Sequence, residues 1–133
     1  MPEKMSASTN ALNWFEIPVT DTERAKKFYE TIFDIQMMSM DMPGGDAQGM
    51  QMIGFPTEAP KSGGALVKSP YHKPSQEGTV IYLNANPDLQ KVLDKIEAAG
   101  GKITMPKTQI TPEIGYMAFF TDSEGNGMAL HSS

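Results

Sequence analysis

Residues 14–33 of this chain are WFEIPVTDTERAKKFYETIF. The segment from 12 to 19 is short and rich in aromatic and β-branched residues, which predicts a strand. Asp21 follows it and is a favourable N-cap for a helix. Apolar residues then recur at the i, i+3, i+4, i+7 spacing of an amphipathic helix: Ala25, Phe28, Tyr29 and Ile32. The sequence therefore predicts a strand followed by a helix over residues 22–33.

The rest of the first half contains three shorter strand candidates. Apolar runs at 35–42 and 50–55 flank a glycine-rich break, which predicts a hairpin with a loose loop. The segment GGALV at 63–67 is a further short strand candidate. Residues 1–10 are polar and aperiodic, which favours a mobile tail, and the proline-containing segment 69–78 is expected to be a linker.

The second half repeats this order. TVIYLNA at 79–85 predicts a strand, and the helix that follows is expected to use Asn86 as a possible cap, with Pro87 at its first position. Its apolar stripe is Leu89, Val92, Leu93 and Ile96, and Gly100 and Gly101 end it. Three strands are predicted at 102–107, 116–121 and 127–131, with a tight turn before the last.

Each half is thus a strand, a helix and three strands, and the halves begin about 67 residues apart. One half alone would expose a whole sheet face, so its independent stability would be marginal. We expect an α+β fold in which two βαβββ modules, at about 11–68 and 79–131, pair into a curved sheet around a cleft. Residues 11–133 would then be a single domain.

The composition excludes several classes of protein. The chain has 133 residues, a net charge of −5 and a single arginine, Arg24, so nucleic-acid binding is not expected. It has no cysteine for disulfides or thiolate sites and only 2 histidines, too few for a three-histidine metal site. No apolar run is long enough to span a membrane and no signal pattern opens the chain, which favours a cytoplasmic protein.

Three stretches carry a resemblance to a known family: residues 14–33, IEAAGGKI at 96–103, and GYMAFFTDSEGNGMALH at 115–131. They resemble the vicinal oxygen chelate superfamily, which includes glyoxalase I, bleomycin-resistance proteins and extradiol dioxygenases. The resemblance covers nearly the whole chain. It implies paired βαβββ modules, frequent dimers, and in the enzymes a divalent metal that chelates neighbouring oxygens of the substrate.

The resemblance also assigns positions to the metal ligands. Counting from the matching motifs, these positions are held here by Trp14, Val80 and Ala129, and less clearly by Gly64 or Ala65. Indole N–H only donates, and the other side chains offer no donor atom to a cation. No cofactor is therefore expected, and a divalent metal is expected only if its site has been relocated.

Strand alternation selects the side chains that would remain in the cleft. With Trp14 facing it, the alternation also brings there Glu16 on the first strand, Tyr82 and Asn84 on the fifth, and His131 on the last. Trp14, Tyr82 and Asn84 are candidate ligand-binding residues, and Glu16 and His131 are candidate catalytic residues. Each also has a purely structural interpretation. Trp14 would be core, His131 solvated, and Tyr82 and Asn84 ordinary strand and turn residues.

Glu16 has three interpretations. It is partly exposed at a strand edge or paired with a lysine such as Lys68, it is a general base or hydrogen-bond acceptor for a ligand, or it is a noncanonical metal ligand. If it is buried and poorly paired, Glu16→Gln raises stability by ~1 kcal/mol. His72, in the linker, is expected to be solvated.

Methionine is unusually frequent, with 11 residues, of which six lie on the predicted hairpin: Met37, Met38, Met40, Met42, Met50 and Met52. Such a hairpin is core, a dimer contact or a ligand lid. We expect a small-molecule binding protein that is a homodimer. Two alternatives remain open: a lyase- or dioxygenase-type enzyme with a relocated or metal-free site using Glu16 and His131, and an interaction module without its own chemistry.

Overall fold

The computed structural model describes residues 3–40 and 49–133, which form two successive modules. The first contains β1 (Trp14–Pro18), α1 (Thr22–Phe33), β2 (Met38–Met40), β3 (Gln51–Gly54) and β4 (Gly63–Lys68). The second contains β5 (Tyr82–Asn84), α2 (Leu89–Ala99), β6 (Lys102–Thr111), β7 (Gly115–Thr121) and β8 (Gly127–Ser132). The predicted order of one strand, one helix and three strands is confirmed in both modules.

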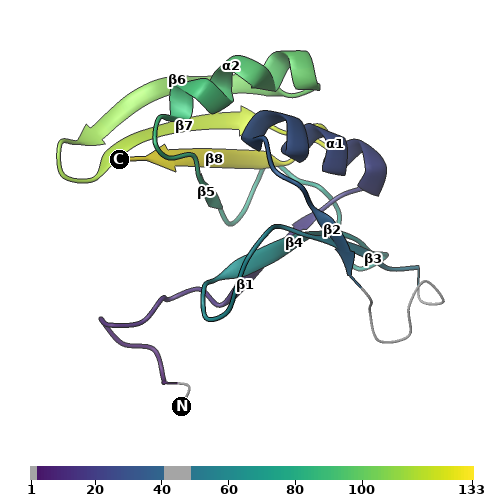
Figure 1. Ribbon diagram of the computed structural model, residues 1–133. Helices are drawn as coiled ribbons and strands as arrows, with labels where there is room; N and C mark the ends of the chain where they lie inside the picture. Colours follow the sequence, from purple (N-terminus) through teal and green to yellow (C-terminus); the bar gives the residue numbers. More distant parts are fainter. Residues whose placement is uncertain (1–2, 41–48) are drawn as a thin grey trace.

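Each module forms its own four-stranded mixed sheet, in the orders β1-β4-β3-β2 and β5-β8-β7-β6. The first strand of each module pairs in parallel with the fourth, and the remaining neighbours pair antiparallel. The fold is therefore α+β, as predicted. In the described part of the chain no ladder joins the two sheets, which lie apart with α1 and α2 packed against one another (Figure 1).

Several strand boundaries differ from the predictions. β5 has only three residues, because just Tyr82, Leu83 and Asn84 pair with β8, although the apolar run spans 79–85. β6 continues past the predicted end to Thr111, since β7 pairs with it there and register shifts absorb the irregular stretch around Pro106. Met42 and the glycine-rich break of the predicted hairpin lie outside the described residues.

Helix α1 has the predicted bounds. Asp21 caps it by accepting the backbone N–H of Arg24 at 3.0 Å, and the chain leaves the helix at Asp34, which has φ 54°. The helix therefore begins and ends where side-chain and backbone groups satisfy its free termini. Its buried face carries the predicted stripe, Ala25, Phe28, Tyr29 and Ile32.

Helix α2 begins later than predicted. Asp88, not Asn86, is the N-cap, because its carboxylate accepts the N–H of Gln90 at 3.0 Å, and Pro87 lies before the helix. Lys107 donates to the same carboxylate at 3.0 Å. The backbone hydrogen bond from Gln90, and then Lys107, lower the pKa of Asp88. Gly100 ends the helix with φ 111°, as predicted.

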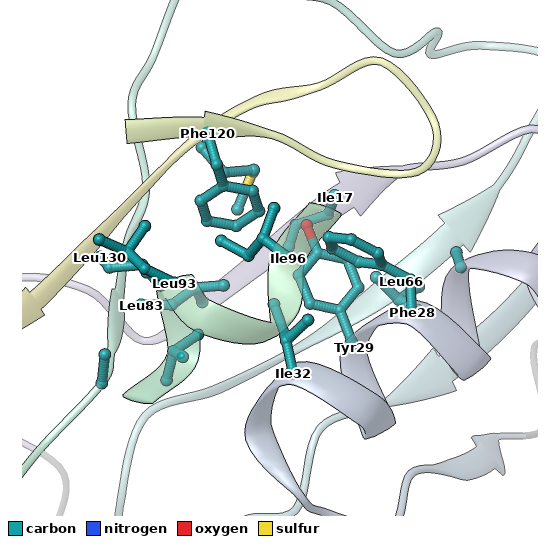
Figure 2. Close-up of a cluster of buried hydrophobic side chains, with 14 of the residues drawn as sticks. Ile17, Phe28, Tyr29, Ile32, Leu66, Leu83, Leu93, Ile96, Phe120 and Leu130 are labelled. Carbon is teal, nitrogen blue, oxygen red and sulfur yellow. The ribbon is translucent and has the colours of Figure 1, made fainter. Parts of the chain in front are cut away.

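One hydrophobic core serves both modules. Tyr29 and Ile32 from α1 and Ile96 from α2 lie among the inward side chains of both sheets (Figure 2). The inward side chains from the sheets are Ile17, Leu66, Leu83, Phe120 and Leu130. The alternation predicted for β1 and β8 is thereby confirmed on the side that faces the helices. Each module covers apolar surface that the other would leave exposed.

A cluster of polar groups ties the modules together at the N-terminal end of α1. Asn126 donates from Nδ2 to the carbonyl oxygen of Pro18 at 2.7 Å. Tyr29 donates its buried hydroxyl to Oδ2 of Asp122 at 2.7 Å. Burial, and then the neighbouring Asp122 carboxylate, raise the pKa of Tyr29 well above its usual value.

Glu124 is the centre of the same cluster. Its Oε1 accepts the backbone N–H groups of Thr20 and Asp21, both at 2.9 Å, and its Oε2 accepts Nε of Arg24 at 2.6 Å. Burial raises the pKa of Glu124, but the hydrogen bonds from Arg24, Asp21 and Thr20 outweigh it and lower the pKa to about 2. We call Glu124, Arg24, Asn126, Asp122 and Tyr29 the intermodule latch.

Candidate functional site

A cavity of about 620 Å³ lies between the modules, on the side of β1 that carries Trp14 and Glu16. Its walls come from β1, the linker, the segment that leads into β5, and the start of β8. Trp14, Glu16 and Tyr82 all line it, as does Val80. Three of the five candidate site residues are therefore brought together at one place, which we call the intermodule cavity.

Trp14 and Glu16 are in direct contact within it. The indole Nε1 of Trp14 donates to Oε2 of Glu16 at 3.1 Å, so both side chains leave the edge strand on the same face. Glu16 is exposed, and in the described part of the chain it forms no ion pair with Lys68 or another lysine. The stability gain expected for Glu16→Gln assumed a buried, poorly paired carboxylate, and that assumption is wrong.

The exposed Glu16 carboxylate accepts a hydrogen bond from the indole but keeps free acceptor positions. A carboxylate has about four acceptor positions, and the indole uses one of them. Oε1 accepts no hydrogen bond in the described part of the chain. Glu16 can therefore accept further hydrogen bonds from a molecule bound beside Trp14.

Tyr82 contributes a second aromatic ring to the lining of the cavity. Its ring meets that of Phe119 edge to face, with centroids 5.8 Å apart. The two rings belong to strands on either side of β8, and both residues are in register with Ala129. Ala129 has an exposed fraction of 0%, whereas Tyr82 is 49% exposed. Because the side chain of Ala129 is only a methyl group, the rings of Tyr82 and Phe119 can meet across it.

The positions of Trp14, Val80 and Ala129 show whether the metal site that the resemblance implies could form here. Trp14 and Val80 line the cavity without offering a ligand atom, and Ala129 lies buried in register between two aromatic residues. The residues at the assigned positions therefore do not fit a cation. Across residues 3–40 and 49–133, no three His, Asp or Glu side chains are grouped so that they could hold a metal ion.

The other two candidates lie elsewhere. Asn84 lines a different cavity, on the helix side of the junction between the modules. His131 is not among the residues that line the intermodule cavity, and its Nε2 lies 2.7 Å from the carbonyl oxygen of Ile114 at the β6–β7 hairpin. The structure therefore separates His131 from Glu16, on which the enzymatic alternative would jointly depend.

The linker contributes residues that the sequence analysis did not place in the cleft. His72 and Lys73 line the intermodule cavity, and Ser75 holds the linker against β8. Ser75 accepts the N–H of Gly127 at 3.0 Å, and its own N–H is bonded to Oδ1 of Asn126 at 3.1 Å. His72 is exposed, as expected, but it is exposed into the mouth of this cavity. In the sequence, the feature connected with this placement is Asn126, next to the turn before the last strand, because its side chain binds the linker at Ser75.

Comparison with known proteins agrees with this fold. The family model described as "Glyoxalase/Bleomycin resistance protein/Dioxygenase superfamily" matches residues 11–130. "Putative glyoxylase CFP32" of Mycobacterium tuberculosis is 30% identical over 134 residues, which is 98% of this chain and 48% of that protein. The chain therefore spans about half the length of this relative. A "Glyoxylase-like domain-containing protein" of Didymella fabae is 29% identical over 119 residues, covering 90% of this chain and 91% of that protein.

Two solved structures illustrate the structural likeness. TnmS3, described as an antibiotic binding protein from Streptomyces sp. CB03234, is 23% identical, with a TM-score of 0.64 over 96% of this chain and 98% of that one. Glyoxalase I from Zea mays is 20% identical, with a TM-score of 0.66 over 92% of this chain and 44% of that one. At these identities the likeness shows the fold. Within the described ranges, no helix is both long and apolar enough to cross a membrane.

Proposed function

Because the chain belongs to the glyoxalase/bleomycin resistance protein/dioxygenase superfamily, we propose that it binds a small planar organic molecule in the intermodule cavity. The observation that carries the proposal is the 3.1 Å hydrogen bond that fixes the Glu16 carboxylate beside the Trp14 ring, in a cavity shared with Tyr82. An aromatic ligand would pack against Trp14 and Tyr82 and donate a hydrogen bond to Glu16. The relative described as an antibiotic binding protein is consistent with this role.

The donor chemistry of the family's ligand positions supports binding without a metal there. Trp14, Val80 and Ala129 stand where the resemblance assigns ligands, and none of them ligates a cation. The ligand would instead be held by aromatic contact and by a charged acceptor. The enzymatic alternative needs Glu16 and His131 together, and His131 does not line the cavity that holds Glu16, which supports binding over that alternative.

The single tryptophan of the chain provides a direct test, since Trp14 is in the proposed site. Trp14 emission would be titrated at pH 9, where both ligands are neutral, with 2-aminoquinoline and with quinoline, which then differ by one hydrogen-bond-donating group. We expect the amino compound to bind more tightly to the wild type, and the difference to vanish in Glu16→Gln. Equal binding of the two compounds to the wild type, or the same preference in Glu16→Gln, would contradict the proposal. Turnover of a bound compound that needs His131 would favour the enzyme instead.

We further propose a homodimer, supported by exposed apolar side chains on β1, β2 and β5 and in the segment that leads into β5. Met38 is 74% exposed on β2, and Trp14, Met40, Val80 and Tyr82 are also exposed. A second copy would cover part of this surface. Met37, by contrast, is buried in the core, so the methionine-rich segment is divided between core and surface. Sedimentation at tens of micromolar would test the proposal, and Met38→Lys should weaken a dimer that buries this face.

A further inference from the structure

A second cavity, of about 450 Å³, lies where the C-terminal end of α1 approaches β5 and α2. Phe15, Phe33 and Phe55 line it from the first module, and Leu83 and Val92 from the second. The intermodule latch joins the modules at the opposite end of α1, beside its N-cap. We call this space the helix-side cavity. Among the described residues, it shares only Phe15 with the lining of the intermodule cavity.

The aromatic wall of the helix-side cavity is held by ring contacts. Phe55 meets Phe15 with centroids 5.5 Å apart and Tyr29 with centroids 5.6 Å apart. Tyr29 in turn stacks on Phe33, with an interplanar angle of 8°. Because Tyr29 is fully buried and bonded to Asp122, the cluster is anchored in the core. The apolar wall therefore exists before any ligand arrives, which is typical of small-molecule sites.

The lining also includes two amide side chains, Asn84, which is exposed, and Asn86. Oδ1 of Asn84 accepts both the backbone N–H and Nδ2 of Asn86, at 2.9 Å each. Since a backbone N–H requires an acceptor, these bonds fix which end of the Asn84 amide carries the oxygen. Nδ2 of Asn84 donates no hydrogen bond elsewhere in residues 3–40 and 49–133, and so remains available as a donor.

The lining also carries no formal charge. Every described residue that lines the helix-side cavity is apolar or neutral, whereas the intermodule cavity includes Glu16 and Lys73. Placing an ionised group against uncharged walls is unfavourable without a partner. The two cavities would therefore select different classes of molecule, and a charged ligand does not suit the helix-side cavity.

We propose that the helix-side cavity is a separate binding site for a small, neutral, mainly aromatic molecule that carries one hydrogen-bond acceptor, such as an aryl ketone. Its ring would pack against Phe15, Phe33 and Phe55. Its carbonyl oxygen would accept a hydrogen bond from the amide of Asn84. This site is independent of the function proposed for the intermodule cavity.

The probe for this site is 6-propionyl-2-(dimethylamino)naphthalene, a neutral naphthyl ketone whose emission shifts to the blue in an apolar site. We expect saturable binding to the wild type. Val92→Phe and Ile35→Phe, which add volume to the lining, should each weaken it at least tenfold. Two such variants are used so that a folding defect in one leaves the other informative. Trp14→Ala and Glu16→Gln should leave binding unchanged, since neither residue lines this cavity.

Asn84→Asp tests the polar contact separately. The aspartate keeps the oxygen that Asn86 requires but removes the donor, so the ketone should bind about three- to tenfold more weakly. 2-(Dimethylamino)naphthalene lacks the carbonyl, so Asn84→Asp should lower its affinity less than it lowers the affinity of the ketone. The proposal would be overturned by the absence of saturable binding to the wild type, or by binding that Trp14→Ala abolishes while both phenylalanine variants retain it. An equal effect of Asn84→Asp on both compounds would contradict the hydrogen bond assigned between the ketone and Asn84.

Discussion

Arg24 Nε lies 2.6 Å from Oε2 of Glu124, a residue 100 positions further along the chain and in the other module. The Glu124 side chain has an exposed fraction of 0%, whereas the Arg24 side chain is half-exposed. Oε1 of the same carboxylate accepts the N–H groups of Thr20 and Asp21, just before α1. One side chain therefore satisfies the start of α1 and fixes the second module against it.

Removing this carboxylate should be costly. Glu124→Ala leaves the N–H groups of Thr20 and Asp21 without their acceptor and Arg24 without its partner, so we expect a loss of about 2–4 kcal/mol in the free energy of unfolding. Urea denaturation measures it. Glu97→Ala, on the exposed face of α2, is the control and should change stability by less than about 0.5 kcal/mol. Equal effects of the two substitutions would show that the latch does not stabilise the fold.

The latch should also make stability depend on acidity. The folded pKa of Glu124 is about 2, below its ordinary value of 4.5, so its contribution is fully present above about pH 4.5 and is lost as the pH falls towards 2. Allowing for the solvent around Arg24, we expect about 2 kcal/mol. The wild type and Glu124→Gln should therefore converge in unfolding free energy between pH 4.5 and 2. A constant difference across that range would rule out this linkage.

Ala129→Glu should destabilise the protein rather than create a metal site. The new carboxylate would be placed at a fully buried position in register with Tyr82 and Phe119, and we expect a loss of about 3–5 kcal/mol. His131→Glu, on the same strand but half-buried, should cost clearly less. Thermal melting with and without Zn²⁺ checks both parts. Stabilisation of Ala129→Glu by the metal would mean that this position is still open to a ligand.

Gly64 and Gly54 provide a matched pair of glycines in adjacent strands. A Cβ on Gly64 would lie 2.5 Å from ring atoms of Phe15, whereas one on Gly54 would meet the flexible end of Met40 at 2.7 Å. Gly64→Ala should therefore cost about 2 kcal/mol and Gly54→Ala less than about 1 kcal/mol. Unfolding measurements should show that Phe15→Leu lowers the additional cost of Gly64→Ala. An additive double mutant would exclude the clash as the cause.

Glu16→Gln should leave the stability of the protein within about 0.5 kcal/mol of the wild type, because Glu16 is exposed and the amide oxygen can still accept from Trp14. Thermal melting measures this. Trp14→Phe, which removes the donor but keeps an aromatic ring, is the companion variant. A loss of several kcal/mol in Glu16→Gln would identify Glu16 as a structural residue and remove it from the proposed site.

The sequence predicted the elements whose determinants are local. Helix α1 has the predicted bounds because Asp21 and the apolar stripe act within a few residues of one another. At α2, Asn86 and Asp88 are both favourable caps, and Asp88, which caps the helix, also accepts a hydrogen bond from Lys107 of β6, a contact that no local pattern records. The length of β6 likewise depended on its pairing with β7, which no local pattern records.

The candidate site was predicted in part for the same reason. Alternation along β1 correctly placed Trp14 and Glu16 on one face, since that relationship spans two residues. Alternation along β5 could not predict that Asn84 and Tyr82 line different cavities, because the two cavities are divided by the packing of one module on the other. The linker residues His72 and Lys73 line the cavity beside Ser75, which is bonded to Asn126, 51 residues further along the chain.

Each sheet is built from the strands of one half of the chain, and no described ladder passes from one to the other. Exchange of a half between related proteins would therefore leave every strand pairing within each half intact. The compatibility of two halves depends on the shared core and on a few side chains, chiefly Glu124 and Asn126 reaching towards Arg24 and Pro18. Recombined or separately encoded halves would therefore assemble stably where both their core surfaces and the two sides of the latch are complementary.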